Sequence, residues 1–139
     1  MSPYQSEDDI ARVVEGFELC TTGKGDFKHS DHLTVAVCYL QNATVTEATD
    51  RLRTALFRFV DHHQVDRQKY NETITIFWLE QVALELEKMS DASLVEQCNS
   101  VIGSLNDAGL VQQYYSAALL FSEKARESFV EPDLKNWRS

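Results

Sequence analysis

The chain has 139 residues, of which 43% are hydrophobic and 25% are charged, and its formal net charge is −9. These values are typical of a globular protein, so we expect one domain over residues 1–139. Acidic residues outnumber lysine and arginine by 22 to 13, which argues against nucleic-acid binding because phosphate recognition needs clustered basic side chains. No segment has the roughly 18 consecutive apolar residues of a membrane helix, and the acidic N-terminus has no apolar signal core. We therefore expect a cytoplasmic protein that does not bind membranes.

Apolar residues recur at helical spacing through most of the chain, which predicts an all-helical fold. The first helix is expected to begin after Ser6, where the sequence resembles a capping box, and to end at 21–25. The second helix should run over about 30–41, with Ser30 or Asp31 as its N-cap.

The third and fourth helices are expected to be the longest. The third covers 43–63 and begins with the capping box of Thr44 and Glu47. The fourth covers 70–89. Its opening, TITIFW, also has strand propensity, but apolar residues continue at helical spacing as far as Leu86, which favours a helix.

The C-terminal part of the sequence has a weaker helical pattern. One short helix is expected from Ser93 to about Ile102, and another from near Ser116 to a point before Pro132. The predicted fold is therefore all-α: a single-domain bundle of four main antiparallel helices plus one or two shorter C-terminal helices.

All four histidines are predicted to lie at one end of this bundle. If the first four helices alternate in direction, the start of the second, the end of the third and the start of the fourth are neighbours. Helical bundles build polar and metal sites from inward imidazole and carboxylate groups at such places. The residues gathered there would be His29, His32, His62, His63 and Glu72.

We predict that His29, His32 and Glu72 form a small-molecule site, as metal ligands or as acid–base catalytic groups, with Tyr70 as a polar orienting group. A divalent metal that takes imidazole and carboxylate ligands, such as zinc, iron or manganese, would suit this set. The sequence contains no HExxH motif, no glycine-rich phosphate loop and no Gly-x-Ser-x-Gly nucleophile motif. The pattern therefore predicts a pocket, and a metal-assisted enzyme is one use of it, but it names no reaction.

Two other interpretations fit the same residues. In the first, the protein is a non-catalytic interaction or regulatory protein, the histidine and glutamate cluster is structural, and the exposed part of 76–89 forms a homodimer interface. In the second, histidines near Glu72 titrate close to neutral pH and act as a pH sensor.

Several short motifs occur together along the chain. They read FKHSDHL at 27–33, YL at 39–40, YNETIT at 70–75, YYS at 114–116, SEKAR at 122–126 and PDL at 132–134. In this combination the chain resembles a group of small bacterial proteins to which no function is assigned, and the resemblance implies no reaction.

The resemblance implies functional roles for two residues of these motifs. Asn71 stands where the related pattern has a histidine, and asparagine can keep a hydrogen bond but cannot shuttle a proton near neutral pH. An altered or lost activity would follow if that histidine is functional. Arg126 is expected to line the pocket and to pair with Glu72 or with an anionic ligand, the alternative being an ordinary surface ion pair.

Overall fold

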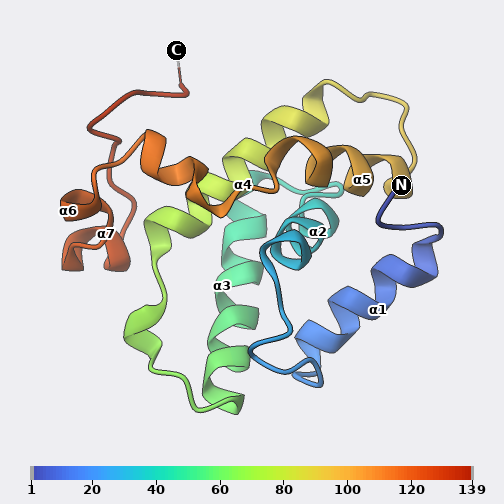
Figure 1. Cartoon of the computed structure of the whole chain (residues 1–139), viewed down its shortest axis with the longest axis horizontal. Helices are drawn as coiled ribbons and strands as arrows, with labels where there is room; N and C mark the ends of the chain where they lie inside the picture. Colours follow the sequence, from blue (N-terminus) through green and yellow to red (C-terminus); the bar gives the residue numbers. More distant parts are fainter. Residues whose placement is uncertain (1, 139) are drawn as a thin grey trace.

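The computed structural model describes residues 2–138, and all regular secondary structure in that range is helical, which confirms the predicted fold class (Figure 1). None of these helices combines the length and the apolar character that crossing a membrane requires. The α-helices are α1 (Glu7–Glu18), α2 (His29–Tyr39), α3 (Val45–His62), α4 (Glu72–Glu87), α5 (Leu94–Leu105), α6 (Ala117–Leu120) and α7 (Glu123–Glu127), with the 3-10 helices η1 (Arg67–Lys69) and η2 (Ala108–Gln113).

The start of α2 differs from the prediction. Its N-cap is Lys28, so the expected N-cap at Ser30 or Asp31 is wrong. Asp31 occupies the third helical position, where its carboxylate accepts a hydrogen bond from the backbone N–H of Lys28 at 2.9 Å. The helix therefore begins at His29, and both His29 and His32 lie in its first turn.

The predicted cap of α3 is confirmed, and the helix expected from Ser93 forms but runs past its expected end near Ile102. Thr44 forms the capping box with Glu47, and Ser93 caps α5, which continues to Leu105. The single last helix expected after Ser116 is instead broken in two, because the Ser122 hydroxyl accepts the backbone N–H of Ala125 and starts a new helix.

Helix α2 lies at the centre of the larger hydrophobic cluster and packs against α1, α3, α4 and α5. Consecutive residues 33–37 of this helix are all buried, as expected for a helix that is covered on every side. The first turn of α2, residues 29–32, is half-buried and leads directly into this buried stretch.

A second, smaller cluster holds the C-terminal part of the chain against α4. It contains Phe77 of α4 together with Val111, Tyr115, Leu120, Ala125 and Val130. Trp78 and Leu110 pack against both clusters, so α4 separates α6 and α7 from the other helices (Figure 1). The ring of Trp137 and the guanidinium of Arg138 donate hydrogen bonds to Glu80 and hold residues 137–138 against α4.

Candidate functional site

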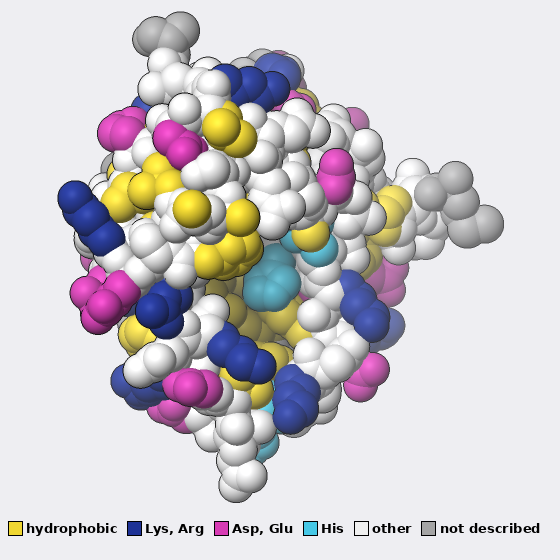
Figure 2. All heavy atoms as spheres, turned by 60° about the vertical axis from the view of Figure 1, so that its left-hand side comes forward, with side chains coloured by type: hydrophobic (Ala, Val, Ile, Leu, Met, Phe, Trp, Pro, Cys, Tyr) yellow, Lys and Arg dark blue, Asp and Glu magenta, His cyan; other side chains and the backbone are white. Residues whose placement is uncertain are grey.

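A cavity of about 300 Å³ lies where α2, α3 and α4 meet η2 and the end of α6. We call it the histidine cavity because His29 and His32 form part of its wall. Figure 2 shows a hollow on this side of the molecule, with histidine and hydrophobic side chains inside it. None of the described residues that line the cavity is Lys, Arg, Asp or Glu. Its apolar lining is Leu33, Ala36, Leu52, Leu56, Ile74, Trp78, Leu79, Ala108, Val111, Leu120 and Phe121.

The ring of His29 is fixed by a hydrogen bond to the end of α5. Its Nε2 lies 3.1 Å from the Leu105 carbonyl oxygen, which can only accept, so Nε2 carries the proton and Nδ1 is the free acceptor of the neutral ring. Burial lowers the pKa of His29 more than this hydrogen bond raises it. His29 is therefore a neutral, oriented imidazole at pH 7.

His32 is set deeper, beside the edge of the Phe27 ring at a centroid distance of 4.4 Å. Burial, and to a smaller extent the neighbouring His29, lower its pKa to about 4, so its ring is also neutral. Neither ring nitrogen of His32 forms a hydrogen bond with any residue in the range 2–138. A neutral imidazole with one donor and one acceptor to spare thus faces the cavity.

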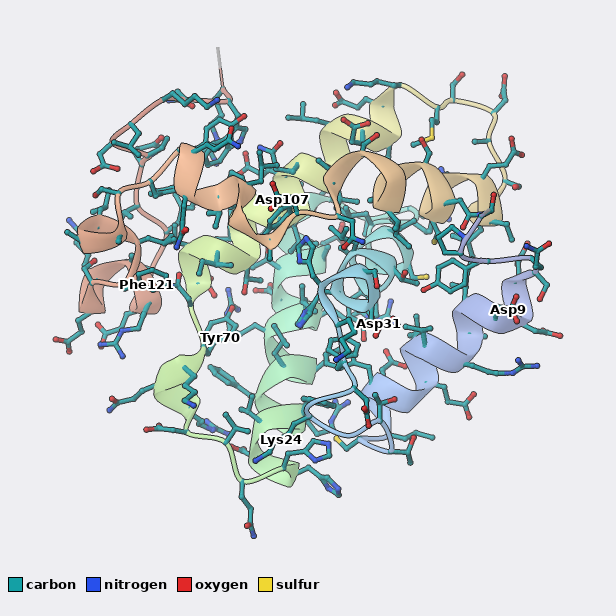
Figure 3. All side chains as sticks on the ribbon, in the orientation of Figure 1. Asp9, Lys24, Asp31, Tyr70, Asp107 and Phe121 are labelled. Atoms are coloured by element: carbon teal, nitrogen blue, oxygen red, sulfur yellow. The ribbon has the colours of Figure 1, made fainter. Side chains whose placement is uncertain are left out.

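Aromatic side chains form one wall and the mouth of the histidine cavity. Trp78 of α4 contacts the edge of the His29 ring at 4.5 Å between centroids. Phe121 follows α6 and is 54% exposed, and Ala108 and Gln112 are also exposed, so the cavity opens to solvent beside these three residues. Figure 3 shows Phe121 and Tyr70 on the same side of the molecule.

Glu72 does not line the histidine cavity. It lines a separate open depression of about 660 Å³ that we call the arginine depression. Its carboxylate is held by two N–H groups of Arg53, with the Nε–Oε1 pair at 2.9 Å, and by the Tyr70 hydroxyl at 2.5 Å. The arginine depression is lined by Arg53, Phe57, Arg67, Gln68, Tyr70, Glu72, Glu123, Arg126 and Glu127.

These contacts decide the charge state of Glu72. Burial raises the pKa of its carboxyl, but hydrogen bonds from Arg53 and Tyr70 outweigh burial and lower the pKa overall. Burial and the same Glu72 carboxylate raise the pKa of Tyr70. The Tyr70 hydroxyl donates to this carboxylate, and the ion pair with Arg53 leaves Glu72 charged and fully engaged rather than free to act as a base.

The predicted metal set is not formed. Residues 2–138 contain no group of three or more His, Cys, Asp or Glu side chains placed to hold a metal ion. His29 and His32 face one cavity while Glu72 faces another, so these three residues provide no ligand set for zinc, iron or manganese.

Asn71 has a structural position at the start of α4. Its side-chain oxygen accepts the backbone N–H of Ile74 at 3.0 Å, and its amide donates to the Leu120 carbonyl at 2.8 Å. Asn71 therefore caps α4 and also ties it to α6, which forms part of the histidine cavity.

Arg126 does not pair with Glu72, because Arg53 takes that place. Its guanidinium donates instead to the Gln68 carbonyl at 3.1 Å, and its Nε is buried without a partner among residues 2–138. It lines the arginine depression, together with Glu123 and Glu127, and does not line the histidine cavity.

The other two histidines lie at the end of α3. His63 packs against Phe59 at 4.5 Å between ring centroids, and Phe59 contacts Phe27, the neighbour of His32. His62 is exposed. An aromatic row therefore connects His32 with His63, while neither lines the depression that contains Glu72.

No protein family, curated protein or solved structure matches this chain. The resemblance to small bacterial proteins therefore stays a prediction. Arg53 and Trp78 were not among the site residues predicted from the sequence. The position of Arg53 next to Asp50 gave no signal for its pairing with Glu72, because that pairing depends on how α3 and α4 pack.

Proposed function

We propose that the protein binds a small, mostly apolar organic molecule in the histidine cavity. The observation that carries this proposal is the combination of an apolar cavity with a neutral, unpartnered His32 ring in its wall. Ligand sites are typically cavities with apolar walls and a few placed polar groups. The volume of about 300 Å³ lies at the lower end of their range and is about twice that of an apolar cavity that binds benzene.

The proposal differs in two ways from the site expected from the sequence. Recognition is assigned to His29 and His32 without Glu72, and no metal ligand set is part of it. Two fixed neutral imidazoles beside an apolar cavity suit binding, and a reaction is not assigned.

The alternative of an interaction or dimeric protein has less support. The exposed large hydrophobic side chains among residues 2–138 are Leu19, Leu84, Phe121 and Leu134, which lie on different elements. Scattered exposed hydrophobic residues are normal on a monomer and do not indicate an interface. Phe121 is explained by its place at the mouth of the histidine cavity. A homodimer remains a prediction that sedimentation of dilute protein can test.

Trp78 provides a direct test, because it lines the cavity and the chain has only two tryptophans. In a Trp137→Phe variant, tryptophan fluorescence excited at wavelengths longer than those the ligand absorbs comes from Trp78 alone. With p-xylene as the probe, we expect a saturable change in this emission. Absence of a saturable change would contradict the proposed function.

A blocking variant locates the binding. Ala108 is exposed and lines the mouth of the cavity, so Ala108→Phe should fill the entrance at little cost to folding and weaken p-xylene binding at least about tenfold. Ala11 is an exposed residue of α1 that lines no described cavity, and Ala11→Phe is the matched control. Equal affinities for the two variants would show that p-xylene binds elsewhere.

A further inference from the structure

The size of the histidine cavity limits its ligand. At about 30 Å³ per water-sized group, the cavity volume of about 300 Å³ corresponds to about ten non-hydrogen atoms. This is the size of a substituted single aromatic ring or a short branched chain, so most of the ligand's surface would contact apolar walls.

The charge of the lining excludes an ionised ligand from the cavity. The lining contains no basic side chain that could pair with an anion and no acidic side chain that could pair with a cation. An ionised group without a partner is far more costly to bury than a neutral polar group. The polar groups that remain are His29, His32, Thr75 and Gln112.

The nearby arginines do not change this conclusion. In the arginine depression, Arg53 is paired with Glu72 and Asp50, and Arg67 is paired with Asp61. Arg126 has no carboxylate partner among the described residues, but Glu123 and Glu127 line the same depression and offset its charge. With a net charge of −9 on the whole chain, an anionic ligand is also repelled at long range.

The free hydrogen-bond donors and acceptors in the cavity wall determine which polar group of a ligand can bind there. His29 already donates from Nε2 to the Leu105 carbonyl, and the Thr75 hydroxyl donates to the Asn71 carbonyl. His32 keeps one donor and one acceptor, and which nitrogen carries its proton depends on the ligand. A hydroxyl group can both donate and accept, so it matches either tautomer of His32.

We infer that the ligand is an uncharged organic molecule with a hydroxyl group, such as a phenol or a small alcohol, and that His32 binds this hydroxyl in the histidine cavity. This inference rests on the proposed function, since it names the class of molecule that the same cavity takes. His32 acts here as the residue that determines specificity, and the apolar walls supply most of the affinity.

The test compares three probes that share a methyl-substituted ring: p-xylene, p-cresol and 4-methylbenzoate. Dissociation constants are measured by NMR titration of the wild type, of His32→Leu and of His62→Leu, the last being the control because His62 is exposed and lines no described cavity. A buried hydroxyl that loses its partner weakens binding, so the affinity of p-cresol relative to p-xylene should fall at least about fivefold in His32→Leu and stay unchanged in His62→Leu. In the wild type, 4-methylbenzoate should bind at least about thirtyfold more weakly than p-cresol.

The outcomes separate this inference from the proposed function. If p-xylene binds but the relative affinity for p-cresol is the same in the wild type and in His32→Leu, the inference is wrong and the proposed function stands. If 4-methylbenzoate binds more tightly than p-cresol, the ligand is anionic and the inference is also overturned; this comparison needs only the wild type and holds even if His32→Leu does not fold. If none of the three probes binds, the proposed function falls together with the inference.

Discussion

Asn71 is expected to stabilise the protein through two side-chain hydrogen bonds, the cap of α4 and a second bond to another element, whereas an ordinary N-cap residue makes only the first. The residue is 7% exposed, caps α4 through Ile74 and donates to the carbonyl of Leu120, a fully buried residue. Asn71→Ala removes the cap, which costs about 1 kcal/mol, and leaves a buried carbonyl without its donor, which costs a further 1–2 kcal/mol or so. We therefore expect the free energy of unfolding to fall by about 2–3 kcal/mol.

A matched variant separates the two effects. Ser93 is exposed, and its side chain caps α5 by accepting the backbone N–H of Glu96. Ser93→Ala should therefore cost only the cap, about 1 kcal/mol. Urea unfolding of both variants measures the difference as a shift in midpoint at constant slope. If Asn71→Ala is no more destabilising than Ser93→Ala, the link from α4 to α6 has no energetic importance and the reasoning is refuted.

Two further predictions concern charged and titratable groups. Arg53→Met should destabilise the protein by about 1–2 kcal/mol in urea unfolding, below the range for fully buried pairs because the Arg53 side chain is 33% exposed. Arg67→Met, which breaks an exposed pair, should have no measurable effect on the free energy of unfolding. Equal effects of the two substitutions would contradict the role of Glu72 burial. Burial lowers the pKa of His32 from 6.5 to about 4, so the unfolded chain takes up a proton at a higher pH than the folded protein. The free energy of unfolding should therefore fall by up to about 3 kcal/mol as the pH falls from 6.5 to 4. His32→Leu should remove this part of the pH dependence and His62→Leu should not; identical profiles for the wild type and His32→Leu would show that His32 titrates normally.

The helices were predictable because their signals are local. Capping residues such as Ser6, Thr44 and Ser93 lie where the sequence places them, and the apolar spacing of α4 outweighs the strand propensity of TITIFW. The C-terminal part was harder because Ser116 and Ser122 each start a very short helix, and such helices have too few residues to show a periodic pattern.

The candidate site was predicted only in part, because it depends on how the helices rotate and pack. The first-turn histidines His29 and His32 do lie together at one cavity. Glu72 is on the adjoining helix, but Arg53 of α3 holds it in the neighbouring depression. Helical spacing gives the face on which a side chain lies; it does not give the partner that the facing helix provides.

The most direct test of the account is the position of p-xylene in the bound state, measured as intermolecular NOEs between its methyl protons and the protein. Binding in the histidine cavity predicts NOEs to the methyl groups of Leu33 and Ile74 and to the indole ring of Trp78, which line this cavity. NOEs confined to Phe57 and Tyr70, in the arginine depression, or no NOEs at saturating p-xylene, would contradict it.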